Sequence, residues 1–334
     1  MNLEQLIKDF LEYLEIERNV SQLTIRNYRH YLERFVLFLA RLGGPSPLPD
    51  PVKPVKTSEV DESEAKEARK TVKISDISAE SIRQYRLFLS RYTDEKGMSL
   101  KRVTQNYHLI ALRSFLKYMA KRDIPTISPD KIDLPKAESR SIKFLEHNDM
   151  DRLLNMPDMN TKEGTRDKAM LEVLFSTGLR VSELVNLNRD QINLDRREFS
   201  VIGKGRRTRI VFLSERAADW LRRYLATRED DLRPIFIRYS GKTPDEHDQT
   251  GESIRLTARS VQRCVEKYAK KAKLMVKITP HGLRHTFATD LLGNGADLRA
   301  IQELLGHKNV STTQIYTHIT NPQLKEIHDK FHSK

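Results

Sequence analysis

The sequence predicts a mainly α-helical protein with one small antiparallel β-sheet, built as an N-terminal helical bundle followed by a larger C-terminal domain. Three observations lead to this prediction. The chain has 334 residues, a length typical of two domains. Apolar residues recur at helical spacing along most of the chain. A stretch with three prolines and no such period, residues 123–142, interrupts this pattern and is expected to link the two domains.

The composition indicates a polyanionic partner. Lys and Arg together number 59 against 46 for Asp and Glu, which gives a formal net charge of +13 and is typical of proteins that bind nucleic acid. The single cysteine, Cys264, excludes an intrachain disulfide and a cysteine cluster for zinc. No long apolar run is present, and acidic residues stand near the N-terminus where a signal peptide would be basic. We therefore expect a cytoplasmic protein that does not enter a membrane.

The N-terminal domain, residues 1–122, is expected to contain four helices. Ser21, Ser78 and Ser99 each precede a new run of helically spaced apolar residues, and are expected to cap the second, third and fourth helices. Residues 43–73 carry five prolines followed by mostly charged residues. This composition predicts a loop insertion between the second and third helices.

The C-terminal domain, residues 143–334, is expected to be mostly helical with one β-hairpin. Residues 198–214 alternate around a glycine-rich turn at residues 203–205, which is typical of a hairpin. Residues 238–254 are polar and are expected to form an insert. The helices are expected at residues 146–155, 164–177, 181–187, 214–227 and 258–272.

The first motif that suggests chemistry is TGLRVSEL. Gly178 lets the chain turn sharply between two helices, and Arg180 then projects from the start of the second helix. Glu183 follows on the same helical face, where it can orient the arginine. Taken alone, this pair would more often be a surface salt bridge without a functional role.

The second motif is GKGRRTR in the turn of the predicted hairpin. Two glycines place Lys204 at the tip, where the side chain can reach into a groove or to a reacting oxygen. Arg206 and Arg207 add two further cations beside the tip. The alternative is an ordinary basic hairpin that contacts phosphate.

The third motif is ITPHGLRHTF, with Thr279 as the expected N-cap and Pro280 at the first helical position. His281 and Arg284 then lie one turn apart near a helix N-terminus, where free N–H groups and the helix dipole favour an anion. The spacing of His281 and His285 also permits a zinc site. Because no Glu lies between them as in HExxH, and no thiolate supports them, we expect no metal.

The fourth motif is LLGHKNVSTTQIYTH. Gly306 is expected to end a helix, and Ser311 with Gln314 forms a capping box for a new helix that carries Tyr316. A tyrosine that follows a helix cap is usually a half-buried side chain that packs against the domain. Here the four motifs together also contain two arginines, two histidines and a lysine, and this combination favours a chemical role for Tyr316.

Together these side chains suit the transfer of a phosphoryl group. Positioned arginines and imidazole N–H groups stabilise the negative charge on the nonbridging oxygens without a metal. A tyrosine can act as the covalent nucleophile and store the bond as a phosphotyrosyl ester. A desolvated lysine among cations has a lowered pKa and can give the leaving hydroxyl its proton.

In this order the four motifs resemble the catalytic boxes of the tyrosine recombinases of the phage integrase family, and within it the Xer-type site-specific recombinases. The segments NVSQLTIRNYRHYLERFVLFL and IALRSFLKYMAKR are similar to the family's helical DNA-clamping domain, so the resemblance covers nearly the whole chain. It implies an N-terminal SAM-like core-binding domain and a C-terminal tyrosine recombinase catalytic domain.

The resemblance also implies roles for individual residues. Tyr316 would be the nucleophile, Lys204 the general acid, and Glu183 a support for the first arginine. The full catalytic set would be Arg180, Lys204, His281, Arg284, His307 and Tyr316. The cations expected to face DNA lie outside the apolar stripes of two N-terminal helices and on the hairpin: Arg26, Arg29, Arg34, Lys101, Arg102, Arg113, Lys117, Arg206 and Arg207.

The implied activity is the cleavage and rejoining of double-stranded DNA through a covalent 3′-phosphotyrosyl intermediate, either to resolve chromosome dimers or as an integrase. No cofactor is expected, because one phosphodiester replaces another. The expected partners are a paired inverted-repeat site and a homotetramer on two such sites, with a second recombinase or a DNA translocase as further candidates. A type IB topoisomerase or telomere resolvase would share the chemistry. A non-catalytic DNA-binding regulator would instead use residues 290–307 as a helix-turn-helix.

Residues 322–334 predict a short tail helix. Leu324, Ile327 and Phe331 lie on one face of it and form an apolar stripe on an otherwise polar segment. Such a stripe packs either on its own domain or on a neighbouring subunit.

Overall fold

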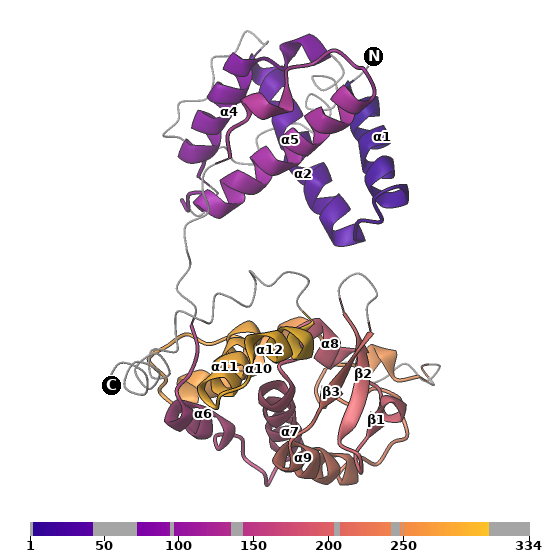
Figure 1. The fold of residues 1–334 in the computed structure, drawn as a ribbon, viewed down its shortest axis with the longest axis vertical. Coiled ribbons are helices and arrows are strands. Elements are labelled where there is room, and N and C mark those ends of the chain that lie inside the picture. Colours follow the sequence, from indigo (N-terminus) through magenta and orange to yellow (C-terminus); the bar gives the residue numbers. More distant parts are fainter. Residues whose placement is uncertain are drawn as a thin grey trace, which may run out of the picture. The chain divides into compact units, whose positions relative to one another are not determined.

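The structure is a computed structural model that describes residues 3–42, 72–93, 97–134, 143–203, 208–241, 248 and 250–306. It divides into two compact units, Met1–Ser139 and Arg140–Lys334, and each is considered by itself (Figure 1). Several predictions fall outside the described residues. These concern most of the insertion at 43–73, the capping box, the tail, and the side chains of Lys204, Arg206, Arg207, His307 and Tyr316.

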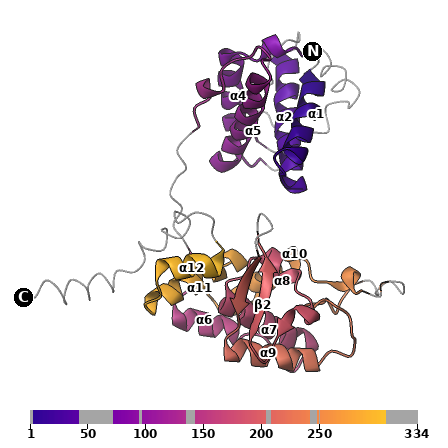
Figure 2. The same cartoon turned by 45° about the vertical axis from the view of Figure 1, so that its right-hand side comes forward.

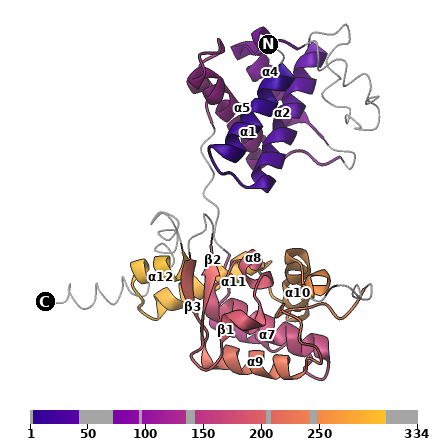
Figure 3. The same cartoon turned by 90° about the vertical axis from the view of Figure 1, so that its right-hand side faces the viewer.

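The N-terminal unit is a bundle of helices around one apolar core. Among the residues that the structure describes, its α-helices are α1 (Leu3–Ile16), α2 (Gln22–Leu42), α4 (Ala79–Arg91) and α5 (Arg102–Lys121), with a short 3₁₀ helix at Ile74–Asp76. Helix α5 packs against the other three, and the helices lie side by side in Figures 2 and 3. Aromatic rings fill the centre, where Phe10 lies 5.4 Å from Phe115 and Phe35 lies 4.9 Å from Tyr85 between ring centroids. The predicted helical bundle is confirmed.

The caps of these helices agree with the sequence in two cases out of three. Ser21 and Ser78 accept hydrogen bonds from the backbone N–H groups of Thr24 and Ser81, as N-caps do. Ser99 does not cap α5, which begins only at Arg102. The prediction for Ser99 was wrong because its backbone pairs with Thr93 in an isolated antiparallel bridge, which holds it in an extended conformation.

The first part of the segment predicted as a linker belongs to the N-terminal unit. Ile132 is 1% exposed, follows a 3₁₀ helix at Pro129–Lys131, and packs in the core of this unit. The side chain of Arg113 on α5 donates to Asp130 at 2.9 Å. The sequence pattern failed here because prolines separate the apolar residues of this segment, so no period links them. Only the later part of the predicted linker, 135–142, lies outside the described residues.

This packing predicts that Ile132→Ala destabilises the N-terminal unit by about 2–5 kcal/mol, as the loss of a buried isoleucine side chain does. Urea unfolding of the full chain, followed by hydrogen exchange at the amides of α5, measures the effect. The neighbouring Lys131 is exposed, so Lys131→Ala should stay within roughly 0.5 kcal/mol of the wild type. Equal stability of the two variants would show that the segment does not contribute to the core.

The C-terminal unit is built around a buried helix, α7 (Lys162–Thr177). Ala169, Met170 and Leu171 on α7 have no exposed surface, and the helix packs against α9 and α11. The remaining α-helices of the described part are α6 (His147–Leu154), α8 (Val181–Val185), α9 (Glu215–Ala226), α10 (Ala258–Lys271), α11 (Pro280–Gly293) and α12 (Leu298–Leu305). The five helices predicted between residues 146 and 272 are all present, with ends shifted by a few residues.

The predicted hairpin is confirmed and forms most of a three-stranded sheet. Strands β2 (Glu198–Ile202) and β3 (Thr208–Phe212) are antiparallel, with Phe199 opposite Val211. A two-residue strand, β1 (Ile192–Asn193), pairs with the outer edge of β2 and was not indicated by the sequence. The inner face of the hairpin covers the core, and α12 lies beside β3 (Figure 3).

The polar insert at 238–254 is closed at its base. Ile237 and Arg255 pair as an isolated antiparallel bridge, and the carboxylate of Asp248 accepts from the backbone N–H groups of Gly251 and Ser253 at 2.8 and 2.6 Å. Across the described ranges, every helix is too short or too polar to span a lipid bilayer.

Candidate active site

The site begins where α7 ends. Gly178 closes the helix in the left-handed conformation, with φ of 58°. A Cβ atom at this position would lie 2.4 Å from the ring of Phe287, so both the backbone conformation and the packing require glycine. The turn sets Arg180 as the N-cap residue of α8, and Glu183 follows in the first turn of that helix.

The carboxylate of Glu183 is the hub of the site. Its side chain is 5% exposed and accepts four hydrogen bonds. Arg180 donates through its backbone N–H and through Nη1, both at 2.8 Å. Arg209 on β3 donates through Nη1 and Nη2, one to each carboxylate oxygen, both at 2.9 Å. The surface salt bridge considered for Arg180 and Glu183 is therefore excluded, because the acid is buried between two arginines.

These contacts determine the charge of the cluster. Burial alone would raise the pKa of Glu183, but the hydrogen bonds from Arg209 and Arg180 outweigh burial and lower the pKa from 4.5 to about 2. The carboxylate is thus ionised at neutral pH. It compensates one of the two guanidinium groups, so the pair of arginines keeps a net positive charge.

Three arginines converge on the carboxyl end of α12. Arg209 donates through Nε to the carbonyl oxygen of Leu304 at 3.0 Å, and Arg284 donates to the carbonyl oxygen of Leu305. Nη2 of Arg180 lies 3.5 Å from the carbonyl oxygen of Gly306, a weaker contact. The last carbonyl groups of a helix have no partner within the helix and carry its negative dipole end, so cations stabilise them.

Helix α11 supplies the remaining predicted side chains. The hydroxyl of Thr279 accepts from the backbone N–H of Gly282, and Pro280 starts the helix, as predicted. Arg284 is 2% exposed and also donates to the carbonyl oxygen of Gly178 at 2.6 Å. Arg284 therefore joins the end of α7 to the end of α12, while His281 lies one turn earlier on α11.

The imidazoles of His281 and His285 pack edge to face, with ring centroids 4.3 Å apart. Burial and then the charges of Arg284 and Arg180 lower the pKa of His281. Burial and then the neighbouring His281 and Arg284 lower the pKa of His285 to about 4. Burial is the larger cause of both shifts, and the smaller contribution from Arg284 reflects positive charge beside both imidazoles, which suits an anion. Over the residues that the structure describes, no three His, Cys, Asp or Glu side chains gather as a metal site would require.

The structure thus brings Arg180, Glu183, His281 and Arg284 into one cluster, whereas Lys204, His307 and Tyr316 lie outside the described residues. Sequence reasoning missed Arg209. A signal was present, because strand alternation places residue 209 on the same face as the buried Val211. A charged residue on a core-facing position of a strand needs a buried partner.

The cations predicted to face DNA divide into two groups in the N-terminal unit. The exposed ones are Arg26, Arg29, Lys101, Arg102 and Lys117. Arg34 and Arg113 are only half-exposed and have partners within the unit. The guanidinium of Arg34 lies 4.8 Å from the ring centroid of Tyr92, and Arg113 pairs with Asp130. The first group is therefore better placed to bind a phosphate backbone.

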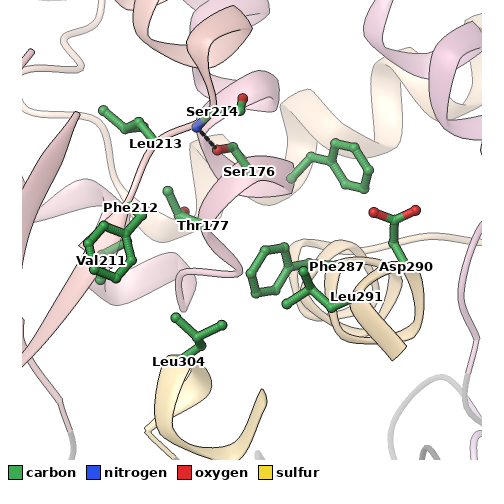
Figure 4. Close-up of a pocket in the computed structure, with 11 residues that line it drawn as sticks. Ser176, Thr177, Val211, Phe212, Leu213, Ser214, Phe287, Asp290, Leu291 and Leu304 are labelled. Atoms are coloured by element: carbon green, nitrogen blue, oxygen red, sulfur yellow. Dashed lines mark hydrogen bonds between the residues drawn. The ribbon is translucent and has the colours of Figure 1, made fainter. Parts of the chain in front are cut away.

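An apolar pocket lies close to the cluster, between α7, β3, α11 and α12 (Figure 4). It has a volume of about 420 Å³. Phe287 and Leu291 of α11 line it opposite Val211 of β3, and Leu304 of α12 closes one side, as Figure 4 shows. At the far rim the backbone N–H of Ser214 donates to the hydroxyl of Ser176 at 2.6 Å.

Known proteins resemble this chain over its whole length. Residues 143–322 match the Phage integrase family, and residues 7–73 match the Phage integrase, N-terminal SAM-like domain. The chain is 35% identical to tyrosine recombinase XerD of Listeria monocytogenes serotype 4b (strain F2365), over 99% of this chain and 100% of that protein. It is 33% identical to tyrosine recombinase XerC of Bacillus subtilis (strain 168), over 100% and 98% of the two chains.

Two solved structures share the fold. The Tn1549 transposon integrase in complex with transposon right end DNA superposes with a TM-score of 0.65, at 18% identity over 98% of this chain and 99% of that chain. The XerH site-specific recombinase bound to palindromic difH substrate gives a TM-score of 0.57, at 19% identity over 89% and 94% of the two chains. At these identities the likeness concerns the fold.

The lowered pKa of Glu183 predicts a specific pH dependence of stability. The ionised carboxylate stabilises the fold fully above pH 4.5, and this stabilisation is lost as the pH falls toward 2. Glu183→Gln should therefore cost roughly 3 kcal/mol at pH 6, and its difference from the wild type should shrink below pH 4.5. Urea unfolding between pH 6 and about pH 3 measures both quantities.

Glu229→Gln is the matched control, because Glu229 is 83% exposed in its ion pair with Lys162 and such pairs contribute little. A Glu183→Gln difference that stayed constant with pH would contradict an ionised, arginine-held carboxylate.

Proposed function

The chain belongs to the phage integrase family of tyrosine recombinases, and we propose that Tyr316 is the nucleophile with which it cuts DNA. Residues 143–322 match the family, and two relatives match over almost their entire length. The protein is a site-specific recombinase that acts on DNA. The observation that supports this assignment is the buried Glu183, which holds Arg180 beside the end of α12. The motif that contains Tyr316 follows directly after that helix in the sequence.

In the proposed reaction, Arg180 and Arg284 stabilise the charge on the scissile phosphate. The lowered pKa of His281 leaves its imidazole neutral, which suits it to take the proton of Tyr316. The phenolic oxygen attacks phosphorus, the bond to the 5′ oxygen breaks, and Lys204 protonates this leaving oxygen, which becomes a 5′ hydroxyl. The reverse reaction with a 5′ hydroxyl of another strand restores a phosphodiester, so the exchange needs no energy cofactor.

We also propose an Xer-like role, in which the enzyme pairs two inverted-repeat sites in the cytoplasm, with a second recombinase or a DNA translocase as further partners. The named relatives and structures are recombinases and an integrase. This favours strand exchange between two sites over a type IB topoisomerase, a telomere resolvase or a non-catalytic regulator.

Tyr316→Phe should abolish the covalent protein–DNA adduct while DNA binding remains, because the change removes only the attacking oxygen. The adduct is measured on denaturing gels with a nicked suicide duplex in the presence of EDTA. Tyr268→Phe is the control, since its hydroxyl bonds to Asp167, which lies outside the Glu183 cluster, and it should still form the adduct. An adduct formed by Tyr316→Phe would place the nucleophile elsewhere.

For the assembly we propose a homotetramer on two DNA sites, in which the tail of one subunit occupies the apolar pocket of the next. The pocket presents Phe287, Leu291 and Leu304, and the tail carries an apolar stripe of matching character. Such an exchange would couple assembly to cleavage, because Tyr316 and the tail follow α12 in the same segment.

Truncation after Thr320 tests this assembly by gel shift and by recombination of two sites. Binding to one site should persist, whereas cooperative pairing and recombination should fail. Lys325→Ala, which keeps the apolar stripe, is expected to behave as the wild type. Full recombination by the truncated chain would exclude exchange of the tail, and a truncated chain that unfolds would show that the tail packs on its own subunit.

A further inference from the structure

Arg209 makes the most complete set of contacts in the cluster. Its side chain is 10% exposed. Both terminal nitrogens donate to Glu183, one to each carboxylate oxygen, and Nε donates to the carbonyl oxygen of Leu304. A planar guanidinium that binds a carboxylate with two parallel bonds fixes the orientation of that carboxylate. Arg209 therefore determines how Glu183 faces Arg180.

The two carboxylate oxygens of Glu183 are each shared. Oε1 accepts from Nη1 of Arg209 and Nη1 of Arg180, and Oε2 accepts from Nη2 of Arg209 and the backbone N–H of Arg180. Without Arg209, the single negative charge of Glu183 would face Arg180 alone. The acid would then compensate the charge of Arg180, and only the two bonds from Arg180 would hold the plane of its carboxylate.

Arg209 also contacts the point from which the chain leaves α12. A Cβ atom at Gly306 would lie 3.0 Å from Cδ of Arg209, so the aliphatic part of Arg209 packs against Gly306. One arginine on β3 thus connects three parts of the proposed active site: the hairpin whose turn carries Lys204, the helix that starts at Arg180, and the end of α12.

We propose that Arg209 is a positioning residue for DNA cleavage. It orients Glu183 so that Arg180 faces the scissile phosphate with its positive charge retained, and it holds the end of α12 through the carbonyl group of Leu304. This role rests on the proposed function, in which Arg180 binds the phosphate. Arg209 donates three of its five N–H groups to Glu183 and to the carbonyl oxygen of Leu304, and through these bonds it acts on Glu183 and the main chain.

The test compares Arg209→Met and Arg209→Lys in single-turnover cleavage of a nicked suicide duplex at saturating protein. Arg209→Met should slow cleavage about tenfold or more, with the Kd for the duplex changed by no more than a fewfold. Arg209→Lys should recover part of the rate, because lysine keeps the charge but lacks the second parallel donor. Arg209→Lys also keeps the test informative if Arg209→Met does not fold.

A double-mutant cycle with Glu183→Gln separates positioning from general stability. If Arg209 acts through Glu183, Arg209→Lys should slow cleavage much less in the Glu183→Gln background than in the wild type. Arg166→Met is the matched control. Arg166 is 12% exposed, pairs with Asp167 and donates to the carbonyl oxygen of Ile237, so it resembles Arg209 in environment but contacts neither Glu183 nor α12 through these bonds.

Multiplicative effects of Arg209→Lys and Glu183→Gln, or a loss of rate in Arg166→Met equal to that in Arg209→Met, would overturn the proposal. Arg180→Ala distinguishes this failure from failure of the proposed function. If Arg180→Ala cleaves at the wild-type rate, the assignment of the site is wrong. If Arg180→Ala is slowed at least 100-fold and Arg209→Met is not slowed, only the role of Arg209 is refuted.

Discussion

The buried carboxylate of Glu183 is the interaction on which the geometry of the site depends. A carboxylate with 5% exposure is costly to bury unless charged and hydrogen-bonded partners surround it. Arg180 provides one partner from the start of α8. Arg209 provides the other from β3, 26 residues after Glu183 in the sequence. The cost of leaving the acid unpaired therefore holds the hairpin and the start of α8 together.

The rest of the catalytic unit supports this cluster by fixing where helices end. Helix α7 is buried on most of its surface and stops at Gly178, which directs the chain into Arg180. Helix α12 has only eight residues, yet the carbonyl groups at its end receive Arg209 and Arg284. A short helix is weakly stable by itself, so these tertiary contacts fix its direction.

The sequence predicted the helices and the hairpin because caps and periodicity are local signals, as Ser78 and Thr279 illustrate. The sequence also predicted Arg180 and Arg284 as residues of the site, because each stands in a short motif. Three features depended on partners outside the local helical pattern and were not predicted: the bridge that holds Ser99 extended, the burial of Ile132, and the pairing of Arg209 with Glu183. None of the three follows from the spacing of apolar residues within one segment, because each depends on contact with a residue outside that spacing.

The arginine contacts at the end of α12 have a consequence for how the protein can change by mutation. Arg209 and Arg284 donate to carbonyl oxygens of Leu304, Leu305 and Gly178, and a carbonyl oxygen belongs to the main chain whatever side chain the residue carries. Substitution can therefore alter the shape of these residues but cannot delete the acceptors. The donors are side chains, so substitution can remove them. The mutations that break this network are therefore expected at the arginines and at the glycines whose backbone conformation the turns require.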